Sequence, residues 1–260
     1  FATPARALLA VLLVNLLLAL AATTFVLREP WLGFVLVPAE RADAPPRVIV
    51  ITSSEPQEGK TVTTLNTAIT LTQSGRKVLL IDGDMRRPRI HKALGAANAG
   101  GLSNYLSGNA DLDDIVQETE IPNLFLVSSG PIPPNPSELL ASEHFDFLME
   151  TLKKSSRFDH VLIDSPPLLS VADPVIMASK AGAVILVVQC GRTARPAVIR
   201  GRQKLAQAKA NILGVVLNDV DVRSGDYYSY RYGYRHRHYR YEDKAEGSEA
   251  AGTTPPRGRR

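Results

Sequence analysis

Short runs of consecutive apolar residues alternate with helical patterns through most of this chain. The apolar runs lie at 48–52, 78–82, 124–127, 161–164, 183–188 and 212–218. Between them, apolar residues recur at helical spacing in three segments, 61–74, 137–154 and 194–210. Strands that are apolar along their whole length are typical of parallel sheets covered by helices on both faces. The pattern therefore predicts an α/β fold with three layers and a mainly parallel sheet.

A longer apolar run precedes this pattern. The segment Ala7–Leu27 contains one strongly polar residue, Asn15, and is long enough to cross a bilayer core of about 30 Å. It predicts one transmembrane helix, with a signal peptide or a buried helix as the alternatives. Positive charge is denser after the segment than before it, which by the positive-inside rule predicts a cytoplasmic body; the arginines are Arg6 before it and Arg28, Arg41 and Arg47 after it.

These patterns divide the chain into five parts. We expect an N-terminal piece of a fragment or processed chain at 1–6, the membrane helix at 7–27, a linker at 28–46, the main domain at 47–222 and a tail at 223–260. The apolar content of 45% is enough for a sizeable core, and the net charge of +4 is concentrated in the tail, so nucleic acid is not an expected partner. The single cysteine, Cys190, excludes a disulfide framework, and its apolar surroundings predict a buried, inert thiol.

A candidate phosphate-binding loop follows the first apolar run of the main domain. Residues 52–61 read TSSEPQEGKT and lie between that run and the first helical pattern. Such a loop needs backbone amides at a helix N-terminus, a lysine for the β and γ phosphates and a hydroxyl for Mg²⁺. Gly59, Lys60 and Thr61 supply that end, whereas Ser54 stands where the usual pattern has its first glycine.

Carboxylates follow two later strands of the predicted sheet. Asp82 and Asp84 end the sequence LLIDGD, and Asp164 ends the run VLID before Ser-Pro-Pro. Because the carboxyl ends of parallel strands share one edge, we expect these side chains to meet the phosphate loop there. Asp164 has the position of a carboxylate that holds Mg²⁺ near the loop threonine. An ordinary helix-capping role is the simpler alternative for any one of them.

The C-terminal tail has an unusual composition. Seven of the eight tyrosines lie within 227–241, interspersed with arginines, and the residues beyond cannot bury enough surface to fold. The cluster indicates either a modification site or a basic aromatic segment for an anionic partner. The tyrosines are Tyr227, Tyr228, Tyr230, Tyr232, Tyr234, Tyr239 and Tyr241.

Together, TSSEPQEGKT, IDGDMRRP, IDSPP and the tyrosine cluster resemble the bacterial tyrosine kinases, the autokinases of polysaccharide co-polymerases. The resemblance covers about 46–241 and implies a P-loop fold of the deviant Walker A type. It implies ATP and Mg²⁺ as cofactors and regulation of exopolysaccharide or capsule biosynthesis and export at the bacterial inner membrane. The implied partners are neighbouring copies of the chain, a low-molecular-weight tyrosine phosphatase and the export machinery.

The resemblance also assigns roles to residues of this chain. It implies catalytic roles for Lys60, Asp82 and Asp84, with Asp82 interpreted as an orienting acceptor that takes the tyrosine proton late. Arg86 is a further candidate for binding phosphate. The implied nucleotide-binding residues are Glu58, Gly59, Lys60, Thr61, Val62 and Asn218, and the implied metal-binding residues are Thr61, Asp82 and Asp164.

One feature of the family is not found. Residues 28–47 contain no match to the Glu-x2-Arg-x2-Arg helix that contacts the neighbouring subunit, although self-association is still expected. Two other functions remain as alternatives: a partitioning or cell-division type of ATPase, and a non-enzymatic module that binds an anionic polymer. The first does not explain the tyrosines, and the second does not explain the three motifs at strand ends.

Overall fold

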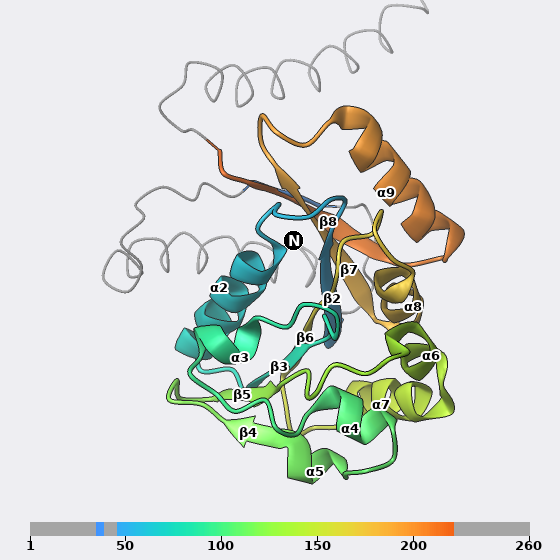
Figure 1. Ribbon diagram of the computed structural model, residues 1–260. Helices are drawn as coiled ribbons and strands as arrows, with labels where there is room; N and C mark the ends of the chain where they lie inside the picture. The colour runs from blue at the N-terminus through green and yellow to red at the C-terminus, as the bar shows by residue number, and fades with distance from the viewer. Residues whose placement is uncertain (1–34, 39–45, 221–260) are drawn as a thin grey trace, which may run out of the picture. The chain divides into compact units, whose positions relative to one another are not determined.

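The computed structural model describes residues 35–38 and 46–220, which form an eight-stranded sheet with helices on both faces (Figure 1). The strands are β1 (Val35–Pro38), β2 (Val48–Ser53), β3 (Val78–Asp82), β4 (Val116–Glu118), β5 (Leu124–Val127), β6 (His160–Asp164), β7 (Ala183–Gln189) and β8 (Ile212–Asn218). The helices are α2 (Lys60–Gln73), α3 (Ile90–Ala93), α4 (Leu102–Leu106), α5 (Leu112–Ile115), α6 (Pro136–Ala141), α7 (Glu143–Lys154), α8 (Asp173–Lys180) and α9 (Arg195–Gln207).

The strand order is β1-β8-β7-β2-β6-β3-β5-β4. The six inner strands are parallel, and the two edge strands β1 and β4 are antiparallel to their neighbours. All six predicted strands are confirmed, as is the α/β class. Strand β1 lies within the segment expected to be a linker, where it pairs with β8 from Val35 opposite Leu217 to Pro38 opposite Gly214.

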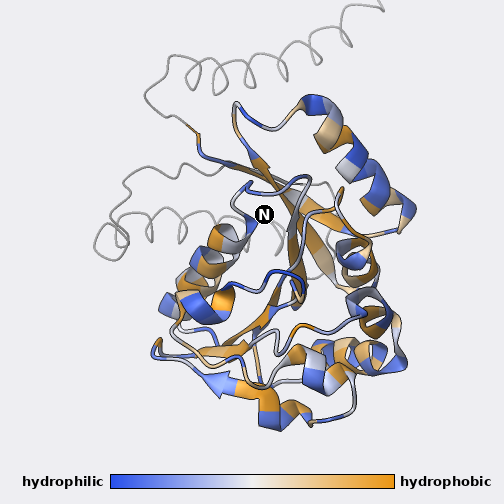
Figure 2. Cartoon of the chain, in the orientation of Figure 1, coloured by the Kyte–Doolittle hydropathy of each residue, from blue (hydrophilic) through white to orange (hydrophobic). Residues whose placement is uncertain are grey.

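Alternate residues of the inner strands build two separate apolar layers. On β2, Val48 and Val50 belong to the apolar layer that includes residues of α4, α7, α8 and α9, while Ile49 and Ile51 belong to the layer on the other face, which includes residues of α2 and α3. Every residue of β2 is buried, as expected for strands that helices cover on both sides. Figure 2 shows this apolar centre inside a more hydrophilic outer surface. Parallel strands then bring all their carboxyl ends to one edge, which carries the functional side chains.

Three expectations about local structure need correction or limits. The helical pattern at 137–154 is two helices, because Ser142 is extended (φ −74°, ψ 161°) and separates α6 from α7. Cys190 is exposed rather than buried, because β7 ends one residue before it. The predicted membrane helix and the tyrosine tail lie outside the described residues, and no helix within the described ranges combines the length and the hydrophobicity needed to span a bilayer.

Candidate nucleotide and phosphoryl-transfer site

The phosphate loop connects β2 to α2 at the carboxyl edge of the sheet. Gly59 immediately precedes α2 and has φ +87°, a conformation that favours glycine. A Cβ atom at Gly59 would lie 2.0 Å from Nδ2 of Asn218, so any other residue at this position would displace the Asn218 side chain. The first turn of α2 has no acidic residue and no side-chain cap, which leaves its amides available to an anion.

Ser54 replaces the first glycine of the usual loop pattern, and the structure shows how it is accommodated. Its side chain is fully buried against α9, where Gly201 provides the space. A Cβ atom on Gly201 would lie 2.9 Å from the Ser54 hydroxyl oxygen. The buried Ser54 side chain therefore depends on the absence of a side chain at Gly201.

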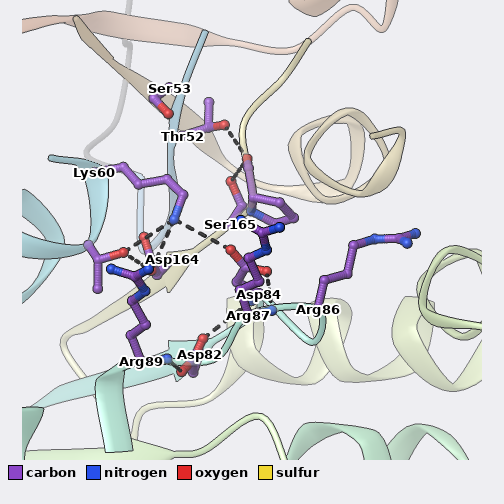
Figure 3. Close-up of polar contacts among 12 residues, drawn as sticks. Thr52, Ser53, Lys60, Asp82, Asp84, Arg86, Arg87, Arg89, Asp164 and Ser165 are labelled. Carbon is purple, nitrogen blue, oxygen red and sulfur yellow. Dashed lines mark hydrogen bonds and ion pairs between the residues drawn. The ribbon is translucent and has the colours of Figure 1, made fainter. Parts of the chain in front are cut away.

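Lys60 and Asp164 lie at the centre of the site (Figure 3), together with Thr61. The Thr61 hydroxyl donates to Oδ2 of Asp164 at 2.7 Å, and Nζ of Lys60 lies 3.8 Å from the same oxygen. The Thr64 hydroxyl lies 3.3 Å from Oδ1 of Asp164. Burial raises the pKa of Asp164, while the Lys60 ammonium and the Thr61 hydrogen bond oppose the rise. This is the arrangement expected for a loop hydroxyl and a strand-end carboxylate that share a metal ion.

The two carboxylates after β3 have different surroundings. Asp84 faces the centre of the site, with Oδ2 located 3.5 Å from Nζ of Lys60. Asp82 is fully buried, and its Oδ2 accepts hydrogen bonds from the backbone amides of Arg89 at 3.1 Å and Ile90 at 3.0 Å. Burial raises the pKa of Asp82 to about 7, and the Asp164 carboxylate adds to the rise while the two amides oppose it. Asp82 therefore organises the turn after β3, and Asp84 is the carboxylate presented to Lys60.

Magnesium would have few protein ligands here. Within residues 35–38 and 46–220, no three His, Cys, Asp or Glu side chains are grouped as a metal site would require. Mg²⁺ in nucleotide sites keeps several waters and binds one or two protein groups together with the phosphates. Thr61 and Asp164 fit that requirement, whereas the Asp82 carboxylate is directed to backbone amides, and the predicted metal roles of all three stay predictions.

The Glu58 side chain stabilises the phosphate loop through hydrogen bonds. Its Oε2 accepts the backbone amide of Glu55 at 2.8 Å, and its Oε1 accepts the hydroxyl of Thr193 from the loop between β7 and α9. Nδ2 of Asn218 donates to the Glu58 carbonyl at 3.0 Å, which connects the end of β8 to the same loop. Asn218 Oδ1 is buried without a protein partner among the described residues, so an acceptor is available there.

Two positions extend or correct the sequence analysis. Thr193 was not predicted, because no pattern in a single sequence links it to a loop 135 residues away. Arg86 does not point at the site: its Nε donates to Oδ2 of the fully buried Asp173 at 2.8 Å, and its Nη2 donates to Ser137 at 3.0 Å. Arg86 therefore joins the turn after β3 to α6 and α8. Val62 lies in the first turn of α2 and is 40% exposed.

A strand-to-helix phosphate loop, placed beside strand-end carboxylates at one edge of a parallel sheet, defines a P-loop nucleotide-binding domain. In agreement, residues 46–213 match the family model described as an AAA domain.

Comparison with known proteins narrows the class. The chain is 41% identical over 190 residues to the tyrosine-protein kinase CpsD of Streptococcus agalactiae, across 71% of this chain and 81% of that relative. The kinase domain of the Escherichia coli tyrosine kinase ETK matches with 34% identity and a TM-score of 0.66, across 69% of this chain and 70% of that one. The chain belongs to the family of bacterial tyrosine-protein kinases.

The fold is shared more widely than this family. The septum site-determining protein MinD of Pyrococcus horikoshii, solved with Mg-ADP, matches with 27% identity and a TM-score of 0.56, across 65% of this chain and 68% of that one. Identity and TM-score are both higher for the tyrosine kinase domain, so the comparisons support the kinase interpretation over the ATPase alternative.

Proposed function

We propose that this chain transfers the γ-phosphoryl group of MgATP to the tyrosines of its own C-terminal tail. The observation that carries the proposal is the convergence of Lys60, Thr61, Asp84 and Asp164 at the edge where β8 ends at Asn218. The chain continues toward the tyrosine cluster from that edge, nine residues after Asn218. At about 3.3 Å per extended residue, the cluster has a reach of roughly 30 to 75 Å, enough for the site of the same or a neighbouring copy.

The positions of the residues support the following roles. Bound MgATP would supply the phosphoryl group and the metal charge that offsets the phosphate oxygens. Lys60 and the amides at the start of α2 would hold the phosphates, and Thr61 with Asp164 would hold the metal. Asn218 presents its free Oδ1 to the amino group of the base, and Glu58 keeps the loop in shape.

Asp84 is the carboxylate placed to orient the tyrosine hydroxyl, because it faces Lys60 and retains slight exposure. Asp82 acts through the turn that its hydrogen bonds with Arg89 and Ile90 fix. Phosphoryl transfer has a loose transition state, so positioning and charge stabilisation are sufficient and a strong base is not required. Asp82 is thus a positioning residue in this scheme.

The family and the sequence patterns together support a cellular setting. In this proposal the segment 7–27 anchors the chain in the bacterial inner membrane, the kinase domain is cytoplasmic, and phosphorylation regulates the synthesis and export of exopolysaccharide or capsule. Neighbouring copies, a low-molecular-weight tyrosine phosphatase and the export machinery are the partners that this setting requires.

The test is tail phosphorylation by the purified full chain with MgATP. Mass spectrometry should place phosphate on residues 227–241, Lys60→Met should abolish it, and replacing the seven tail tyrosines by phenylalanine should remove it while nucleotide binding persists. Release of phosphate from ATP without phosphotyrosine would favour the ATPase alternative. If nucleotide has no effect on either the unsubstituted protein or the Lys60→Met protein, the polymer-binding alternative is favoured.

A further inference from the structure

Helix α9 carries positive charge that no acidic side chain of residues 35–38 and 46–220 balances through an ion pair. Along the chain, residues 174–218 contain no aspartate or glutamate, and the cations in and beside α9 are Arg192, Arg195, Arg200, Arg202, Lys204 and Lys209. Ala197, Gly201 and Leu205 form the buried side of the helix. Arg195, Arg200 and Arg202 are exposed, and among the described residues none of their guanidinium groups makes an ion pair or a hydrogen bond.

Helix α7 of the same domain shows what balanced charge looks like. It has acidic residues in its first turn and lysines in its last, and Glu150 pairs with Lys153 and Lys154. In α9 the placement of charge along the helix is unfavourable, because Arg195 lies in the first turn, where the helix dipole favours anions. No side chain caps that end of the helix. Figure 2 shows the hydrophilic turns of α9 at the surface of the domain. Such a surface is complementary to a polyanion.

The exposed side of α9 has a definite stripe. Arg195, Ile199 and Arg202 are spaced i, i+4 and i+7, so they follow one another on the same side of the helix over about 10 Å. Ile199 is 46% exposed, which places an apolar contact between the two guanidinium groups. We call Arg195, Ile199 and Arg202 the α9 stripe.

The tail of this chain becomes a polyanion if the proposed function is right. In an extended chain residues two apart share a side, so Tyr228, Tyr230, Tyr232 and Tyr234 would align at about 6.6 Å intervals, and Arg231 and Arg235 would face the other way. Each phosphate adds about −1.5 to −2 charges. Phosphorylation thus turns one side of a basic segment into a row of phosphates.

The connection between tail and helix is short. β8 ends at Asn218, whose carbonyl accepts the amide of Cys190 at 2.8 Å, so the chain leaves the sheet beside the loop that begins α9. Tyr228 lies eight residues beyond Val220, a reach of about 26 Å, while α9 is about 20 Å long. Attachment this close gives an effective concentration in the millimolar range, so even modest affinity is sufficient.

We propose that the phosphorylated tail binds the α9 stripe of its own chain, with phosphotyrosines paired to Arg195 and Arg202. This inference depends on the proposed tail phosphorylation as the source of the ligand. The unphosphorylated tail is basic and is repelled by α9, so docking follows phosphorylation. Docking holds the modified tyrosines on α9 and away from Lys60, which separates the product from the site that made it.

The experiment supplies the phosphotail independently of kinase activity. The full chain with Lys60→Met is titrated into a fluorescent peptide of residues 225–242 that carries phosphotyrosine at 228, 230, 232 and 234, and binding is read by fluorescence anisotropy. We expect the phosphopeptide to bind at least about tenfold more tightly than its unphosphorylated form. Arg195→Glu with Arg202→Glu should weaken phosphopeptide binding at least about tenfold, because each reversal replaces attraction by repulsion.

A matched control distinguishes a specific effect of the α9 stripe from an effect of the protein's net charge. Arg76→Glu with Lys77→Glu changes the charge equally at exposed positions before β3, and should change the affinity less than about twofold. Equal binding of the two peptides, or equal loss in both charge-reversed proteins, would overturn the proposal. The proposal would also be overturned if Arg195→Glu with Arg202→Glu abolished binding of the protein to anionic phospholipid vesicles but left phosphopeptide binding unchanged.

Autophosphorylated protein with Lys60 intact tests occupancy by the chain's own tail. It should bind the added phosphopeptide at least about fivefold more weakly than the Lys60→Met protein, independently of protein concentration. Weakening that grows with protein concentration would mean that tails bind neighbouring copies, contrary to the proposal. If the protein carries no phosphotyrosine after incubation with MgATP, the proposed function fails, while the peptide titration still decides whether the stripe binds phosphotyrosine.

Discussion

Asp82 provides the sharpest quantitative prediction, because its burial changes the stability of the fold with pH. Its pKa is about 7 in the folded chain and 3.8 as an ordinary aspartate. Between these values the folded state holds more protons than the unfolded state, so stability falls as pH rises and the loss is complete above pH 7. A rise of about 3 units corresponds to about 4 kcal/mol, of which about 3 kcal/mol develops between pH 5 and pH 8.

Asp82→Asn removes this cost, because an amide does not ionise. The unfolding free energy of the variant minus that of the unsubstituted protein should therefore rise by about 3 kcal/mol from pH 5 to pH 8. The constant loss of the hydrogen bond from the Asp84 amide to Oδ1 of Asp82 cancels in this pH comparison. Groups that titrate similarly in both proteins also cancel.

Urea unfolding followed by far-UV circular dichroism at pH 5, 6, 7 and 8, without nucleotide, measures the difference. Asp113→Asn is the matched control, because it removes a carboxylate whose side chain is 83% exposed, and its stability difference should change by less than about 0.5 kcal/mol over the range. A change below about 1 kcal/mol for Asp82→Asn would refute the assignment of a buried, pKa-shifted carboxyl. Loss of autophosphorylation in the same variant is expected, and full activity would remove its positioning role.

Three further substitutions test the loop and its supports, each by urea unfolding. Gln57 has φ +66°, so Gln57→Val should cost about 1–2 kcal/mol while Gln57→Gly costs nothing, and equal costs would contradict backbone strain. Gly59→Ala should lower the free energy of unfolding by at least about 2 kcal/mol. In the Asn218→Ala protein the same substitution should cost at least about 1 kcal/mol less, and additive effects of the two substitutions would contradict the close contact. Arg86→Ala should cost about 2 kcal/mol by leaving buried Asp173 unpaired, and Asp173→Asn should recover part of it; no recovery would mean that the charge is not the cause.

The sequence predicted the inner sheet well because apolar runs record burial directly. Each run became a parallel strand, and the requirement that parallel strands share a carboxyl edge was sufficient to bring Lys60, Asp84 and Asp164 together. The two edge strands were not predicted: β4 (VQE) carries little of that signal, and β1 (VLVP) is apolar but lies within the segment that was interpreted as a linker. Periodicity continued through Ser142, where the backbone alone separates two helices.

The sequence patterns did not predict contacts between segments that are distant along the chain. Asp173 neutralises Arg86 across 87 residues, and Thr193 reaches Glu58 across 135. No local pattern in the sequence indicates these long-range contacts, so Arg86 was interpreted as a candidate for binding phosphate from its place in the motif alone. Ser54 illustrates the same limit: the glycine that compensates for it is Gly201, on a helix that begins more than 140 residues later.

The carboxyl groups at the centre of the site lower the stability of the empty domain, and the buried sheet offsets that loss. Within the part of the chain that the structure describes, Lys60 is the one ammonium that pairs with Asp84 and Asp164, and Asp82 lies directly opposite Asp164 in the register of β3 and β6. The Asp84 and Asp164 carboxyl groups beside this cation are suited to attract Mg²⁺. Burial first, and then the charge of Asp164, raise the pKa of Asp82, so an ionised Asp82 weakens the empty domain. The sheet buried on both faces offsets that cost, and a bound metal cation relieves it. Asp82→Asn should therefore stabilise the empty domain at pH 8, because the variant has no buried carboxyl to ionise, and it should lessen the stabilisation by MgATP, because a metal cation beside Asp164 has less negative charge to offset.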